Sequence, residues 1–150
     1  MTEAQQLMDQ LVGAWTLVEW SERRPDGGKA FPLGADAIGQ IIYSADGHVA
    51  AQLARRDVRS FASGDWRDAR LDEASRAFKD YFGYFGTFTI DVTARSVVHH
   101  VEGSWFPNLY GVDQPRRFRL DGDVLHLDAD TDWGQVVIIW KRAEAFPSAG

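Results

Sequence analysis

Apolar and polar residues alternate along most of the chain in short runs, and this two-residue period is typical of β-strands. Turn sequences such as Ser44-Ala45-Asp46-Gly47 and Asp121-Gly122 separate several of these runs. Strands that follow one another through tight turns favour an antiparallel meander over the βαβ alternation of parallel sheets. We expect strands at residues 15–20, 38–43, 48–54, 87–92, 97–105, 116–120, 123–128 and 135–142.

Two segments show helical spacing instead. Residues 3–11 predict a short N-terminal helix. A second helix is expected from Leu71 to Tyr84, with Asp72 as its N-cap. An amphipathic helix between strands must bury its apolar side, so we expect this helix to cover the mouth or the outer wall of the sheet structure. Its apolar stripe consists of Ala74, Phe78, Tyr81, Phe82 and Phe85.

About eight short strands predict an all-β fold, a closed antiparallel barrel, because closure removes the exposed edges of an open sheet. The length of 150 residues suits one domain, residues 1–150. Six Trp, nine Phe and four Tyr supply aromatic surface for a β core or for a concave ligand site. A barrel of this size is filled by its own side chains or holds one small ligand.

Composition excludes several classes of protein. A net charge of −6 without a basic block disfavours nucleic acid as a partner. The chain has no Cys, which excludes disulfides and thiolate metal sites, and we expect neither a metal nor a cofactor. No apolar run is long enough to span a membrane, and the N-terminus lacks the pattern of a signal peptide, so we expect a cytoplasmic protein.

The hairpin around Asp121-Gly122 predicts which side chains face the interior. A two-residue turn there places Leu120 opposite Asp123 and gathers one apolar face. Arg116 lies at the end of that face, where an arginine needs a partner. It either anchors a ligand carboxylate or carbonyl, or it reaches the rim or pairs with an internal acid. The apolar face comprises Phe118, Leu120, Leu125 and Leu127.

The strand at 97–105 places its two adjacent histidines on opposite faces. His99 belongs to the more apolar, inward face with Val97, Val101, Gly103 and Trp105, whereas His100 points outward with Glu102. The pair is therefore unsuited to binding one metal ion. His99 is either a general acid or base in a cavity or a core histidine that is bonded to a backbone carbonyl.

These positions predict an interior site. As catalytic candidates we assign His99, Arg116 and Tyr84, for isomerisation, cyclisation or hydration of a carbonyl compound. The hydroxyls of Tyr84 and Tyr81 either reach the ligand or only pack the helix on the barrel. Common catalytic motifs such as G-x-S-x-G are absent from the sequence, which leaves catalysis open. The expected ligand-lining residues are Tyr43, Gln52, Phe78, Tyr81, Phe88, Val101, Trp105, Phe118 and Trp140.

Gly13-Ala14-Trp15, before the first strand, resembles the G-x-W signature of lipocalins and related calycins. This resemblance implies that Trp15 closes the narrow end of the barrel and that a basic residue of the last strand, Arg142, packs across it. The chain is also similar to the bacterial and fungal lipocalin-like domain proteins, whose group has no agreed catalytic motif. The stretches that carry this similarity are 11–15, 42–47, 61–65, 84–87, 99–104, 106–108 and 120–123.

The leading hypothesis is that the barrel binds a small, largely hydrophobic organic metabolite that bears a carboxylate or carbonyl. Some small proteins of similar architecture are isomerases or cyclases of secondary metabolism, so an enzyme of that type is one version of the hypothesis. The alternative is an interaction or homodimerisation module with a filled barrel. Outward-facing Val137 and Ile139, next to inward Ile138 and Trp140, would then form a contact surface or lie under a helix.

Overall fold

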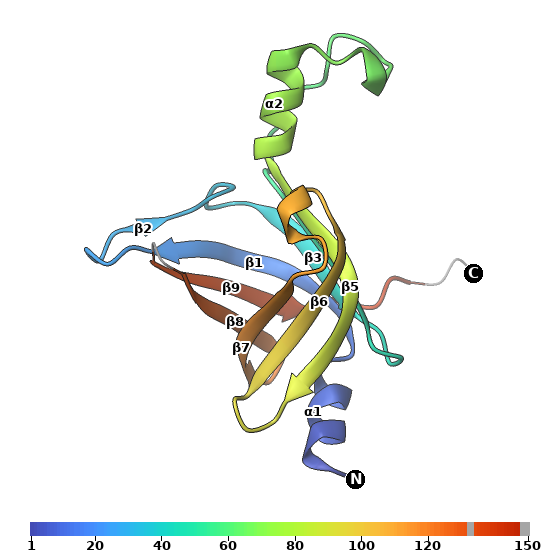
Figure 1. The fold of residues 1–150 in the computed structure, drawn as a ribbon, viewed down its shortest axis with the longest axis vertical. Coiled ribbons are helices and arrows are strands. Elements are labelled where there is room, and N and C mark those ends of the chain that lie inside the picture. Colours follow the sequence, from blue (N-terminus) through green and yellow to red (C-terminus); the bar gives the residue numbers. More distant parts are fainter. Residues whose placement is uncertain (132–133, 148–150) are drawn as a thin grey trace.

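The computed structural model describes residues 1–131 and 134–147. Within these residues eight strands close into an antiparallel barrel, because β1 pairs with both β3 and β9 (Figure 1). This confirms the predicted closed barrel. The elements are α1 (Glu3–Leu11), β1 (Gly13–Arg23), the short added strand β2 (Lys29–Ala30), β3 (Ile38–Tyr43), β4 (His48–Ala54), α2 (Leu71–Lys79), β5 (Tyr81–Asp91), β6 (Ser96–Ser104), β7 (Asp113–Asp121), β8 (Val124–Thr131) and β9 (Gly134–Arg142), with 3-10 turns at Trp66–Asp68 and Pro107–Leu109.

The two ends of the barrel differ in their connections. Short turns join β3 to β4, β5 to β6 and β7 to β8 at one end, where α1 also lies (Figure 1). We call this the closed end. The long connections 24–37, 55–80 and 105–112 gather at the opposite end, which we call the open end.

Trp15 fills the barrel interior at the closed end. It is fully buried, and its indole nitrogen donates to the carbonyl of Leu11 at 2.9 Å. The Arg142 guanidinium lies 4.1 Å from the Trp15 ring centroid and donates to the carbonyls of Val12 and Gln10. Cation–π attraction and two hydrogen bonds therefore tie the last strand to the N-terminal segment, as the resemblance implied.

The β7–β8 hairpin turns one residue later than we expected. Asp121 pairs with Val124, so the central residues of the turn are Gly122 and Asp123. Gly122 has a φ of +59°, which fits a type II′ turn with glycine in the first central position. The predicted register was therefore wrong, whereas the predicted inward face is retained. Phe118, Leu125 and Leu127 are buried.

The second helix is shorter than the predicted range of 71–84. It begins after Arg70 as N-cap, not after Asp72, and ends at Lys79. Strand β5 starts at Tyr81, and its residues pair on both sides with β4 and β6. The three- and four-residue spacing of aromatics was misleading, because pairing in the middle of a sheet outweighs local helical periodicity.

Helix α2 does not lie along the barrel wall. It stands out beyond the open end (Figure 1), and its buried residue is the charged Glu73, whose carboxylate accepts from the backbone nitrogens of Ala62 and Arg70. The expected apolar stripe therefore does not cover the outer wall: Ala74 and Phe78 are exposed on α2, and Tyr81, Phe82 and Phe85 belong to β5. Phe78 provides a contact with the barrel rim, where it stacks on Trp105 at 5.8 Å.

Candidate functional site

The inward-facing side chains are buried toward the closed end of the barrel, and several of them are partly exposed toward the open end. Inward-facing side chains toward the closed end are buried, including Trp140 and Leu125. Five inward-facing residues toward the open end are only partly buried: Trp20, Phe82, Gln114, Arg116 and Ala129. Partial exposure of these side chains means that solvent reaches the mouth of the barrel at the open end.

Aromatic rings line the interior from the open end toward the closed end. The Trp20 and Phe82 ring centroids are 5.2 Å apart, and Phe82 lies 5.6 Å from Tyr84. Tyr43 and Phe88 make an edge contact at 4.9 Å deeper in the barrel. Such a lining suits a small aromatic or otherwise apolar molecule.

Three strands bring a polar cluster into this aromatic interior. Tyr84 of β5 and Tyr43 of β3 bind opposite edges of His99 on β6: the Tyr84 hydroxyl is 2.5 Å from Nδ1, and the Tyr43 hydroxyl is 2.7 Å from Nε2. All three side chains are at most 5% exposed. We call these three residues the Tyr–His–Tyr cluster.

Burial keeps the whole cluster uncharged. Desolvation, reinforced by the positive charge of Arg116, lowers the pKa of His99 to about 3. Desolvation raises the pKa of Tyr84 to about 12 and that of Tyr43 well above its usual value, although Arg116 opposes both increases. At neutral pH the imidazole is therefore neutral and both phenols keep their protons.

Arg116 enters the interior from β7, opposite Val97, on the face that the alternation predicted. Its Nη2 donates to Oε1 of Gln114 and its Nη1 to the carbonyl of Pro115, both at 3.0 Å. Among residues 1–131 and 134–147, Arg116 has no carboxylate partner. Its charge therefore acts on the Tyr–His–Tyr cluster without being neutralised by an ion pair there.

Residues 12–143 match the lipocalin-like domain family. The chain belongs to this family. The 4'-hydroxy-3'-methoxypropiophenone carrier protein of Aspergillus oryzae is 29% identical over 85 residues, which are 53% of this chain and 77% of that protein. A redesigned β-barrel of known structure is similar over 96% of this chain and 98% of that chain, with 15% identity and a TM-score of 0.47.

Several predicted lining residues of the lipocalin-like barrel lie inside it. Phe88, Val101, Phe118 and Trp140 are buried on inward positions. Trp105 is partly buried at the rim, with its ring 4.5 Å from that of Phe82. Their contact with a ligand stays a prediction.

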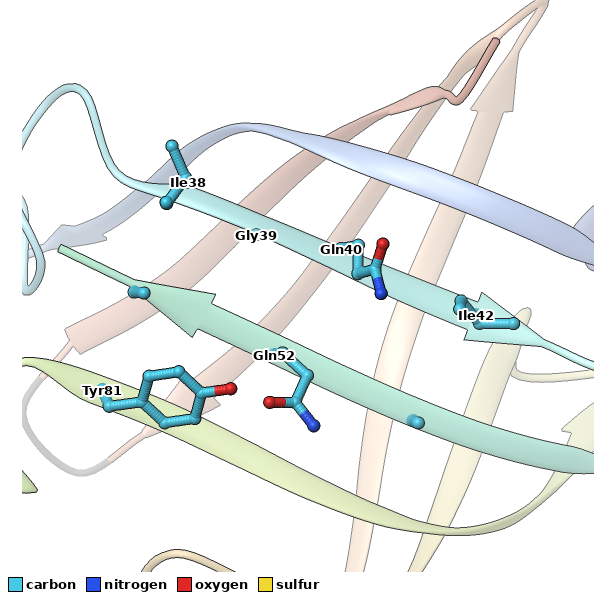
Figure 2. Close-up of a pocket in the computed structure, with 8 residues that line it drawn as sticks. Ile38, Gly39, Gln40, Ile42, Gln52 and Tyr81 are labelled. Carbon is cyan, nitrogen blue, oxygen red and sulfur yellow. The ribbon is translucent and has the colours of Figure 1, made fainter. Parts of the chain in front are cut away.

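Three other predicted lining residues lie outside the lipocalin-like barrel. Gln52 alternates with the inward Ala51 and Leu53, and Tyr81 alternates with Phe82. Figure 2 shows both on the outer wall of β3, β4 and β5, beside a hollow of about 450 Å³. Phe78 is on α2 and is 45% exposed. The period of two would have placed Gln52 correctly.

Irregular strands of the lipocalin-like barrel explain further differences. Gly103 was expected to face inward, but the pairing of β5 and β6 shifts between Phe85 and Gly86. Gly103 consequently lies outside, under the Phe85 ring, and Ser104 pairs with Tyr84. A similar shift between Leu17 and Glu19 turns Trp20 and Glu22 inward, and no local sequence pattern predicts this shift.

The described residues form neither a metal site nor a membrane-spanning helix. In the part of the chain that the structure describes, no three His, Asp or Glu side chains gather so as to hold a metal ion. No helix of the described residues has the length and hydropathy that a membrane span requires. The Tyr–His–Tyr cluster and Arg116 therefore remain the candidate functional site.

Proposed function

We propose that this lipocalin-like protein binds and carries a small aromatic carbonyl compound inside the barrel. The observation that carries the proposal is an uncharged polar cluster, flanked by Arg116, within an aromatic interior whose side chains are partly exposed at the open end. Ligand sites of this kind combine an apolar lining with a few polar groups that fix orientation. The similarity to a carrier of an aromatic ketone supports the same ligand class.

Binding explains this site better than catalysis does. A general base must be able to accept a proton near neutral pH. Both ring nitrogens of His99 are engaged by tyrosines, and its pKa is lowered to about 3. An isomerase or cyclase that used His99 as its base would work against both features, whereas a carrier needs only fixed hydrogen-bond partners.

Calorimetric titration with propiophenone tests the proposal. Ala129→Trp fills an inward position at the open end, and Ala50→Trp adds the same ring to the outer wall as a matched control. We expect the first variant to bind at least about tenfold more weakly and the second to bind like the wild type. Equal affinity in Ala129→Trp would place the ligand outside the barrel.

A second candidate function is self-association through the outer wall of β3, β4 and β5. Ile38, Ile42 and Phe85 are 40–54% exposed there, and the hollow in Figure 2 has no charged residue in its lining. Two copies of a chain with a net charge of −6 repel each other. Contact through an uncharged wall keeps this electrostatic repulsion smallest. Sedimentation velocity should show a dimer that Ile42→Lys dissociates, and a monomer at every concentration would exclude it.

A further inference from the structure

The Tyr–His–Tyr cluster contains more hydrogen-bond donors than it uses. A neutral imidazole has one N–H donor and one acceptor nitrogen, and each phenol brings one O–H. The cluster therefore has three hydrogens for two hydrogen bonds. Whichever ring nitrogen carries the hydrogen, one tyrosine accepts from His99 and keeps its own hydroxyl hydrogen free.

The position of the tyrosines along the barrel selects which hydroxyl is free. Tyr43 is the last residue of β3 and pairs with Gly13 at the closed end. Tyr84 is the fourth residue of β5, which starts at the open end, and its ring contacts that of the partly exposed Phe82. A ligand that enters from the open end meets Tyr84 first.

Other inward groups are also donors. The indole nitrogens of Trp20 and Trp140 are buried and have no acceptor among residues 1–131 and 134–147. Arg116 offers five N–H donors, and the described contacts use two of them. The Ser21 hydroxyl is the third buried group without a partner in that part of the chain. Ser21 pairs with outward-facing Val137, so its hydroxyl does not face the interior.

We propose that the interior selects ligands by a hydrogen-bond acceptor, an aryl carbonyl oxygen, and that the Tyr84 hydroxyl is its donor. Tyr43 donates to Nε2 of His99, Nδ1–H of His99 donates to the Tyr84 oxygen, and the Tyr84 hydrogen points to the ligand. Tyr43 and His99 are thus positioning residues. This inference rests on the proposed function, because it names the ligand class of the same site.

A carboxylate at the open end would favour the opposite kind of ligand, one that donates hydrogen bonds. Glu22 pairs with Val136 on an inward position at the open end, and burial raises its pKa. An aryl amine could use this carboxylate at the rim. Comparing the affinities of a ketone, a hydrocarbon and an amine therefore shows whether a ligand binds the Tyr84 hydroxyl or the Glu22 carboxylate.

The test compares three ligands of nearly the same shape, propiophenone, propylbenzene and 1-phenylpropylamine, in the wild type and in Tyr84→Phe. We expect the ratio of ketone to hydrocarbon affinity to fall about tenfold in Tyr84→Phe, while the hydrocarbon affinity stays within about twofold. Tyr81→Phe, on the outward side of the same strand, is the matched control and should leave the ratio unchanged. Tyr43→Phe should also lower the ratio, because Tyr84 then turns its hydrogen toward Nδ1.

The outcomes distinguish the two proposals. Failure of both propiophenone and propylbenzene to bind would overturn the proposed function. Binding of both with an unchanged ratio in Tyr84→Phe, or tighter binding of the amine, would overturn only the acceptor selection. Nitrogen NMR of His99 gives a reading without ligand: a protonated Nδ1 and an unprotonated Nε2 are expected, and the reverse tautomer would refute the assignment to Tyr84.

Discussion

Acid should destabilise this barrel through His99, and His99→Gln should remove that sensitivity. The pKa of His99 falls from 6.5 to about 3 in the folded protein, chiefly because the ring is buried. Below pH 6.5 the unfolded chain binds a proton that the folded chain does not bind. The free energy of unfolding therefore decreases as the pH falls, and the decrease continues down to a pH of about 3.

The size of the effect follows from the shift. Well below pH 6.5 each pH unit costs about 1.4 kcal/mol, so going from pH 7.0 to pH 4.5 removes about 2–3 kcal/mol from the free energy of unfolding. A total stability of about 5–15 kcal/mol is usual for a small domain, so the loss is measurable. Glutamine can accept and donate as the neutral imidazole does, but it does not titrate.

The assay is urea unfolding followed by tryptophan fluorescence at pH 7.0, 6.0, 5.0 and 4.5. The difference in stability between wild type and His99→Gln should shift by about 2–3 kcal/mol in favour of the variant between pH 7.0 and 4.5. His100→Gln is the matched control, because His100 lies on the outward face beside Asp113. The same pH dependence in wild type and His99→Gln would refute the reasoning.

Three further predictions concern the fold. Arg142→Met should cost about 1–3 kcal/mol of stability in urea unfolding, because it removes the cation–π contact with Trp15 and two hydrogen bonds, and a loss below about 0.5 kcal/mol would contradict this. Gly86→Ala should destabilise by more than about 2 kcal/mol, since its Cβ would lie 1.9 Å from the carbonyl oxygen of His100, whereas Gly64→Ala, with nothing within 4 Å, should change stability by less than about 0.5 kcal/mol. Phe78→Ala should speed proteolysis within 55–80 by loosening α2 from Trp105, with little change in the unfolding of the barrel, and an unchanged cleavage rate would show that α2 is held elsewhere.

Regular strands were predictable from the sequence, and irregular ones were not. The inward direction of Phe118 and of His99 follows from the period of two. In the β7–β8 hairpin the turn lies one residue later than expected, which changes the pairing by two residues and leaves the inward face unchanged. The shift in β1 after Leu17 and the shift in β6 between Val101 and Gly103 reverse the alternation without a local signal. Trp20 was therefore missed, and Gly103 was assigned to the wrong face.

The candidate site shows the same division. Tyr84 was selected as a candidate although it was assigned to a helix, and only the pairing of β5 with β4 and β6 brings its hydroxyl to His99. Tyr43 is 56 residues away from His99, so their hydrogen bond depends on barrel closure, which no sequence period encodes. The residue types were predictable, whereas their joint geometry required the fold.

The Tyr–His–Tyr cluster contributes little to the stability of the barrel. Apolar side chains of the same shape could replace all three partners with little loss of stability, because a net hydrogen bond contributes only about 1 kcal/mol. The buried imidazole also makes the fold sensitive to acid, since its pKa is lowered to about 3. A cluster that adds little to stability and leaves one hydroxyl hydrogen without an acceptor among the described residues is therefore better explained by a ligand that completes it than by the needs of the barrel.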